Sequence, residues 1–64
     1  MIHINGVDDA FLNESVEALL VRRGVEPRGV AVAIDGEVVS RSAWANTLIP
    51  DHCHVEIVTA AAGG

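Results

Sequence analysis

The residues that could do chemistry most directly are the last ones, because the sequence ends in three alanines and two glycines. Residues 60–64 have too little side chain to support a core, and glycine loses the most backbone entropy on ordering. A Gly-Gly end arises by chance in roughly one chain in 200, from a glycine frequency of about 7%. The unhindered carboxylate of Gly64 is suited to activation by ATP to an acyl-adenylate. The adenylate can accept sulfur to give a thiocarboxylate, or an amine to give an isopeptide, and a partner enzyme would be the catalyst.

A second candidate is the run His52-Cys53-His54, because imidazole and thiolate groups bind zinc and other soft metals. Adjacent residues at the start of a strand point in alternating directions, however, so they rarely converge on one ion. His3 can lie nearby if the terminal strands pair, but no fourth ligand is evident. We therefore expect these residues at the surface or at a sheet edge, with no metal site.

Nucleophilic catalysis and ligand binding are also weakly supported. Cys53 lies beside a histidine, but catalytic partners are usually brought together by the fold, and no orienting group or oxyanion hole is evident. The turn dipeptides Asn5-Gly6 and Asp35-Gly36 are not the glycine-rich strand-to-helix turn that cradles phosphate. Trp44 could stack on a ligand, although a lone Trp in so small a chain is more often core. We expect no catalytic residue, no bound cofactor and no deep pocket of the usual ~300–1,000 Å³.

Size and charge narrow the classes of function further. Sixty-four residues allow one domain with a small core, and the single cysteine excludes an internal disulfide and fits a reducing compartment. The net charge of −5, with only four basic side chains, is unfavourable for binding nucleic acid or an anionic membrane. No apolar run approaches the ~18 residues that span a membrane, and no secretory signal is visible. A cytoplasmic protein that docks on other proteins is the expectation.

The elements that position the chain end follow from periodicity and turn signals. Residues 1–5 alternate apolar and polar and predict a strand, and an Asn-Gly turn then leads to a second, weaker strand over residues 7–12. A helix follows, capped by Asn13 or Ser15 and ended by Gly24. Its apolar stripe consists of Val16, Leu19 and Leu20.

The second half predicts further strands around a helical turn. Residues 30–34 alternate large and small apolar side chains, which suits a central strand buried on both faces. Residues 37–39 and 55–59 predict two more strands, and residues 41–45 predict a short helical turn in which Trp44 closes the core. This order describes an α+β domain in which one main helix crosses one face of a mixed sheet of four to five strands.

A set of motifs spread along the whole chain also carries a family resemblance. It comprises Val32-Ala33-Ile34-Asp35, Val38-Val39, Arg41, Trp44, Leu48, Asp51, Val55-Glu56-Ile57-Val58 and Ala62-Gly63-Gly64, together with the helix residues Val16, Ala18, Leu19 and Leu20. In these the chain resembles the ThiS family, the small sulfur carriers of thiamine biosynthesis, which have a ubiquitin-like β-grasp fold. The resemblance implies a β-grasp domain over residues 1–59 and a flexible C-terminal Gly-Gly tail over residues 60–64.

The resemblance also implies an activity. Gly64 would be adenylated by an E1-like adenylyltransferase of the ThiF type, which consumes the ATP, and converted to a thiocarboxylate with sulfur from a donor such as a cysteine desulfurase system. A ThiG-type thiazole synthase would then use that sulfur to build the thiazole ring. Gly63, preceded by Ala62, would enter the partners' channels. The chain itself would be a carrier and not an enzyme, a monomer that meets its partners transiently.

Two departures from the family pattern and several alternatives stay open. The family commonly has Asp-Gly-Asp before the last strand, whereas this chain has Asp51-His52-Cys53, so the turn must form without its glycine. The first hairpin is also a little short. The alternatives are a carrier for molybdopterin or another sulfur pathway, a ubiquitin-like modifier conjugated through Gly64, and a β-grasp interaction module without a functional tail. Docking is expected to use an exposed apolar patch on the sheet.

Overall fold

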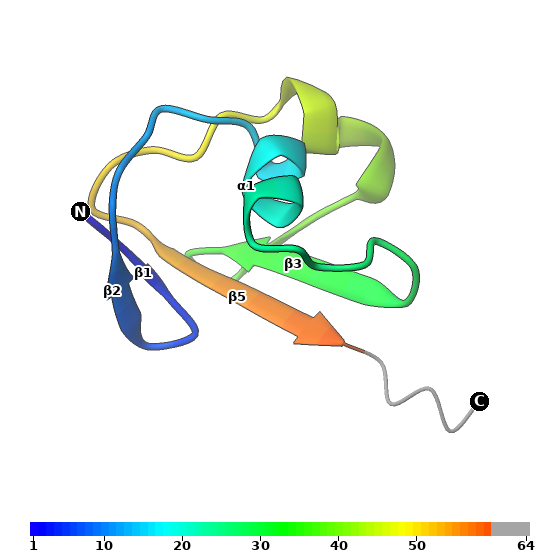
Figure 1. Cartoon of the computed structure of the whole chain (residues 1–64), viewed down its shortest axis with the longest axis horizontal. Helices are drawn as coiled ribbons and strands as arrows, with labels where there is room; N and C mark the ends of the chain where they lie inside the picture. Colours follow the sequence, from blue (N-terminus) through cyan, green and yellow to red (C-terminus); the bar gives the residue numbers. More distant parts are fainter. Residues whose placement is uncertain (60–64) are drawn as a thin grey trace.

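The computed structural model describes residues 1–59, so the predicted tail residues Ala62, Gly63 and Gly64 lie outside the described part of the chain. Residues 1–59 form five strands, one α-helix and one 3-10 helix (Figure 1). In chain order these are β1 (Ile2–Ile4), β2 (Val7–Asp9), α1 (Val16–Arg22), β3 (Val30–Ile34), β4 (Glu37–Val39), η1 (Arg41–Asn46) and β5 (His54–Thr59).

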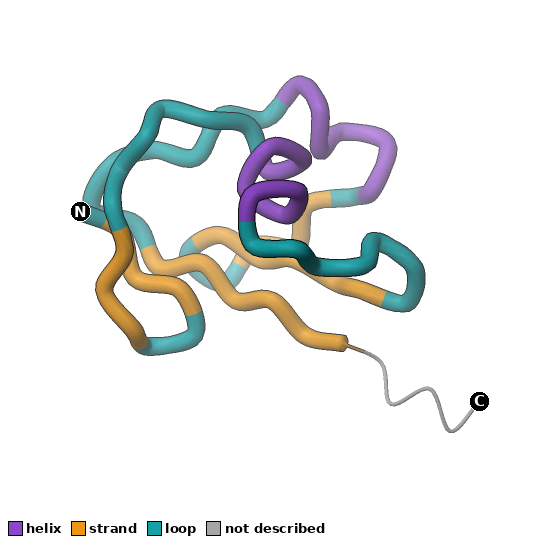
Figure 2. The backbone as a smooth tube through the Cα atoms, viewed as in Figure 1, coloured by secondary structure: helices purple, strands orange, loops and turns teal. Residues whose placement is uncertain are grey.

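The strands form one mixed sheet in the order β2-β1-β5-β3-β4. The antiparallel hairpins β1–β2 and β3–β4 flank β5, which runs parallel to β1 and antiparallel to β3. Both helices lie on one side of this sheet (Figure 2). The predicted α+β fold of the β-grasp type, with one main helix and a short helical turn around Trp44, is confirmed.

Both hairpins turn through the predicted dipeptides. Asn5 and Gly6 have φ angles of 51° and 82°, and Asp35 and Gly36 have φ angles of 50° and 84°. Two successive residues with positive φ are typical of the type I′ turn, whose twist matches that of the flanking strands. The two-residue turns therefore set the register of each hairpin.

Helix α1 is capped at both ends as the sequence predicts. Ser15 is the N-cap, and its Oγ accepts a hydrogen bond from the N–H of Ala18 at 3.1 Å. At the other end Gly24, with a φ of 68°, follows the last turn. The N–H of Gly24 donates to the C=O of Val21, and the N–H of Val25 donates to the C=O of Leu20. These two bonds are the Schellman arrangement. Asn13, the alternative N-cap, lies two residues before the cap.

Strand β2 is shorter than predicted, because it ends at Asp9 and not at Leu12. The Asp9 carboxylate accepts a hydrogen bond from the N–H of Ala10 at 2.7 Å. Such a local bond between a side chain and the backbone competes with the hydrogen bonds of a sheet. Asn13 then adopts a φ of 52°, and residues 10–14 form a loop that leads into α1.

The core lies between the sheet and the two helices. The buried apolar side chains of residues 1–59 are Ile2, Ile4, Val16, Leu19, Leu20, Val32, Trp44, Ile49, Cys53 and Val55. They include the predicted apolar stripe of α1. Trp44 closes the core as expected, and its Nε1–H donates to the carbonyl of Val39 at 3.0 Å, so the polar end of the indole is satisfied.

The prediction that β3 is buried on both faces was wrong. Val32 is buried, whereas its neighbour Ala31 is exposed and Ala33 is half-buried. The helices cover only one face of the sheet, so the alternation of large and small side chains separates a core face from an open face.

Candidate functional site

Strand β5 determines where the chain end leaves the domain. It is the central strand, paired with β1 through His54 and Val55 and with β3 from Val55 to Thr59. Its last residue, Thr59, is still paired with Val30. The predicted site residues begin only beyond this point, at Ala62, Gly63 and Gly64, and lie outside the described residues.

Turn side chains brace β5 from both sides. The side chain of Asn5 makes two hydrogen bonds to the backbone of Ile57: its Oδ1 accepts from the N–H at 2.8 Å, and its Nδ2 donates to the C=O at 3.2 Å. On the other side, Asp35 Oδ1 accepts from the N–H of His54 at 2.9 Å. Asn5 therefore continues the β1–β5 pairing beyond the last residue of β1.

The run His52-Cys53-His54 does not converge on one point. Cys53 is buried in the core, while the His54 ring stacks on the His3 ring, with 4.7 Å between the ring centroids. The side chain of His52 is 83% exposed. Within residues 1–59, no group of three or more His, Cys, Asp or Glu side chains is arranged to hold a metal ion.

The expectation that Cys53 lies at the surface or at an edge was wrong. Its side chain points to the same side as that of Val55, two residues later, which is also buried. Burial raises the pKa of the thiol, and the nearby Asp35 carboxylate acts in the same direction. The reactive thiolate is therefore disfavoured, and Cys53 acts as a small apolar core residue.

The turn before β5 forms although His52 stands where the resemblance led us to expect glycine, because His52 itself adopts a positive φ. His52 has a φ of 63°, a region in which a side chain costs energy. Asp51 Oδ1 accepts from the N–H of His52 at 2.9 Å and also pairs with the ammonium group of Met1. The N–H of His52 further donates to the C=O of Met1 at 3.0 Å. These bonds hold the turn against the start of β1.

The open face of the sheet carries an apolar patch that the sequence reading did not assign. Cross-strand neighbours Val38 and Ala33, and Ala31 and Val58, share this face. Val38 is 74% exposed and Val58 is 59% exposed. We call these four residues the open-face patch, which is bordered by the exposed Glu56, the partner of Ala33 in β5. They match the expected exposed apolar patch on the sheet, and the alternation in β3 was the signal that could have located it.

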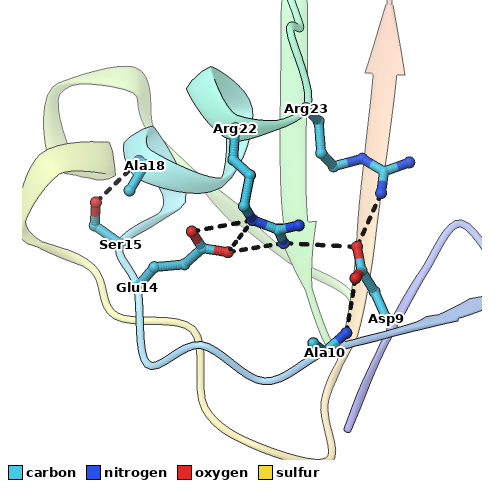
Figure 3. Close-up of polar contacts among 7 residues, drawn as sticks. All are labelled: Asp9, Ala10, Glu14, Ser15, Ala18, Arg22 and Arg23. Carbon is cyan, nitrogen blue, oxygen red and sulfur yellow. Dashed lines mark hydrogen bonds and ion pairs between the residues drawn. The ribbon is translucent and has the colours of Figure 1, made fainter.

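An ion-pair cluster fixes the loop before α1 to the end of that helix (Figure 3). Arg22 Nη2 lies 2.9 Å from Glu14 Oε2 and 3.5 Å from Asp9 Oδ2, and Arg23 Nη1 lies 2.9 Å from the same Asp9 oxygen. The N–H of Ala10 and the two arginines lower the pKa of Asp9. Both arginines lie at the C-terminal end of α1, where positive charge also suits the helix dipole. The cluster explains how residues 10–14 are held without regular structure.

Two surface cavities accompany these features. The larger, about 320 Å³, lies between the β3–β4 hairpin and the connection from η1 to β5, and we call it the β4 groove. Its lining residues are Ile34, Asp35, Glu37, Val38, Val39, Thr47, Leu48 and Pro50. A smaller apolar cavity of about 160 Å³ lies beside Trp44 and the end of α1. The β4 groove reaches the lower limit of the usual volume range but is an open surface groove and not a deep pocket.

Comparison with known proteins decides the family. The family model described as "ThiS family" matches residues 2–64. The chain belongs to the ThiS family.

The chain is also similar in structure to the thiamine biosynthesis protein ThiS from Geobacter metallireducens, with a TM-score of 0.81 and 28% sequence identity. That similarity covers 98% of this chain and 97% of the Geobacter chain. No curated protein matches the chain. The family and this structure support a sulfur carrier of thiamine biosynthesis. No helix within residues 1–59 is long and apolar enough to cross a membrane.

Proposed function

We propose that this protein is the sulfur carrier for thiazole formation and that the carboxylate of Gly64 is the group that carries the sulfur. The carboxylate attacks the α-phosphorus of ATP on an E1-like adenylyltransferase of the ThiF type, and pyrophosphate leaves. A persulfide of the donor then displaces AMP to give an acyl disulfide, and a second thiol cleaves its S–S bond, which leaves the thiocarboxylate and releases a disulfide. The sulfur derives from a donor such as a cysteine desulfurase system, and a ThiG-type thiazole synthase accepts it.

One observation carries this proposal: the match to the ThiS family extends over residues 2–64 and therefore includes the Gly-Gly end. The described part of the chain is compatible with it. Residues 1–59 offer no metal-binding cluster, and their one thiol is buried. In the proposed scheme the folded domain supplies no side-chain chemistry, since the partner enzymes carry it out.

The central position of β5 supports the role of the domain as a holder for the chain end. The strand is paired on both sides, and its pairing with β3 persists to Thr59. A fully extended peptide spans at most ~3.3–3.6 Å per residue, so the five residues after Thr59 can reach up to about 18 Å from the sheet. Alanine and glycine present no branched side chain that would block entry into a narrow channel.

The open-face patch is the surface on which we propose that the partners dock. Val58 belongs to it and lies one residue before the end of β5. A partner that covers Val38 and Val58 would therefore also lie next to the exit of the chain end. Burial of exposed apolar surface is the usual driving force of such contacts.

The experiment is intact-mass spectrometry after incubation with the cognate adenylyltransferase, ATP and a sulfur source. We expect the mass increase for replacement of one oxygen by sulfur, located in a C-terminal peptide that contains Gly64. A chain extended by one alanine after Gly64 is the matched control, because its fold is unchanged and its carboxylate is displaced.

The proposal is contradicted if an active cognate enzyme consumes ATP without transferring sulfur to the wild-type chain. Isopeptide bonds from Gly64 to lysines of cellular proteins would instead identify a modifier. Transfer of the sulfur to a molybdopterin precursor, and not to thiazole synthase, would identify the other sulfur pathway.

A further inference from the structure

The β4 groove combines an apolar opening with a firmly held wall. Val38 on one side is 74% exposed and Leu48 on the other is 60% exposed. The wall that carries Leu48 is fixed by two backbone bonds of 2.9 Å, from Val16 N–H to Thr47 C=O and from Ile49 N–H to Glu14 C=O. The groove is therefore an open depression of about 320 Å³ with one wall held by the backbone, and it has room for an apolar side chain supplied by another molecule.

The charge around this groove is negative and uncompensated. Asp35 and Glu37 line it, and neither has an ion-pair partner within residues 1–59. No arginine lines the groove. Arg22 and Arg23 are engaged in the ion-pair cluster, and Arg41 donates to the carbonyl of Pro27 and lies over the Trp44 ring. The groove therefore attracts a cation next to an apolar group.

The groove is continuous with the open-face patch, because Val38 belongs to both. We propose that the β4 groove receives a segment of the adenylyltransferase that inserts an apolar side chain between Val38 and Leu48 and places a Lys or Arg against Asp35 and Glu37. This rests on the proposed function, since it takes the adenylyltransferase as the partner. It adds the chemistry of the contact: an apolar residue flanked by a basic one.

The test is the dissociation constant and association rate of the full-length chain with its cognate adenylyltransferase, measured by biolayer interferometry without ATP at two salt concentrations. Glu37→Lys reverses one rim charge, and Glu26→Lys is the charge-matched control at an exposed position outside the groove. Leu48→Ser removes the apolar wall, and Leu12→Ser is its control, because Leu12 is 52% exposed and lies in the loop before α1. Circular dichroism melts verify the fold of each variant.

We expect Glu37→Lys to weaken binding about tenfold, mainly through a slower and less salt-dependent association, as is typical of charges at the rim of an interface. Leu48→Ser should weaken binding to a similar extent through faster dissociation, while both controls bind as the wild type does.

Wild-type binding with unchanged affinity in Glu37→Lys and Leu48→Ser overturns the inference and leaves the proposed function standing. Loss of binding in Leu48→Ser alone overturns the assignment of a basic residue. A free wild-type chain that sediments as a dimer, and becomes monomeric with Leu48→Ser, shows that a second copy occupies the groove and also overturns the inference. A wild-type chain that neither binds the enzyme nor gains sulfur overturns the inference and the proposed function together.

Discussion

Replacing Asn5 with glycine separates the backbone requirement of the first hairpin turn from the role of the side chain in the sheet. Glycine adopts the φ of 51° found at Asn5 without strain, so the type I′ turn is retained. The substitution removes both side-chain hydrogen bonds to Ile57, at 2.8 and 3.2 Å. The N–H and C=O of Ile57 then lose their partners on the β1 side of the sheet.

The magnitude follows from these two bonds. Each contributes ~0.5–1.5 kcal/mol net, and partial access of water to the site favours the lower half of that range. The added chain entropy of glycine is offset by relief of the left-handed strain at Asn5. We expect the free energy of unfolding to fall by ~1–2 kcal/mol, which lowers Tm by roughly 5–15 °C in a domain of this size.

Urea and thermal unfolding measure this loss, and hydrogen exchange of the Ile57 amide locates it. Asp35→Gly is the matched comparison, because Asp35 holds the equivalent turn position with a φ of 50° and makes one bond of 2.9 Å to the N–H of His54. It should cost about as much as Asn5→Gly, at ~1–2 kcal/mol, because one bond to a carboxylate is roughly twice as strong as a bond between neutral groups. Unchanged stability of Asn5→Gly with unaltered exchange at Ile57 would refute the reasoning.

Three further predictions test other parts of the structure. His52→Gly should raise the free energy of unfolding by ~0.5–1 kcal/mol in urea titrations, because it relieves a φ of 63°, whereas His52→Ala should give no gain. Asp9→Asn should destabilise the domain at neutral pH. Because the folded pKa of Asp9 lies below its usual 3.8, its contribution is present above that value and disappears as acid protonates it. The difference from wild type should therefore shrink as the pH falls through the folded pKa, and a pH-independent difference would count against the ion-pair cluster. Cys53 is buried and the pKa of its thiol is raised, so in the native protein it should react with a thiol reagent only as fast as the domain opens. In urea it should react at the full rate of a free thiol. Fast reaction of the native protein would contradict its place in the core.

Local signals predicted the elements of this fold well. The Asn-Gly and Asp-Gly dipeptides give turns with two positive φ angles, Ser15 caps α1, and Gly24 ends it. Each of these features depends on a backbone requirement that only a few residue types satisfy, so it can be read from neighbouring residues. The family resemblance supplied the fold class, whereas the strand order β2-β1-β5-β3-β4, which depends on pairings between distant segments, came only from the structure.

Features that depend on distant contacts were missed. The pairing of Asp9 with Arg23 joins residues 14 positions apart, and no spacing rule connects a strand end with a helix end. The alternation of large and small side chains in β3 could be read from the sequence, but only the arrangement of the helices shows that one face of the sheet stays open. Cys53 was predicted at the surface because His52 and His54, its neighbours on both sides, are polar. Val55 lies two residues later and faces the core, and this spacing already indicated that Cys53 faces the core as well. The role of Gly64 stays a prediction, since it lies outside the described residues.

The structure indicates why a carrier of this kind would hold its last strand so firmly. To displace β5, a partner must break pairing with both β1 and β3, the braces from Asn5 and Asp35, and the burial of Val55. If the reacting group lies at Gly64, the domain contributes only the position and direction of the exit, and the partner supplies the chemistry. Weakening the braces by Asn5→Gly should then raise the carrier concentration that half-saturates the adenylyltransferase and leave the rate at saturation unchanged. A fall in the saturated rate alone would mean that the domain takes part in the chemical step.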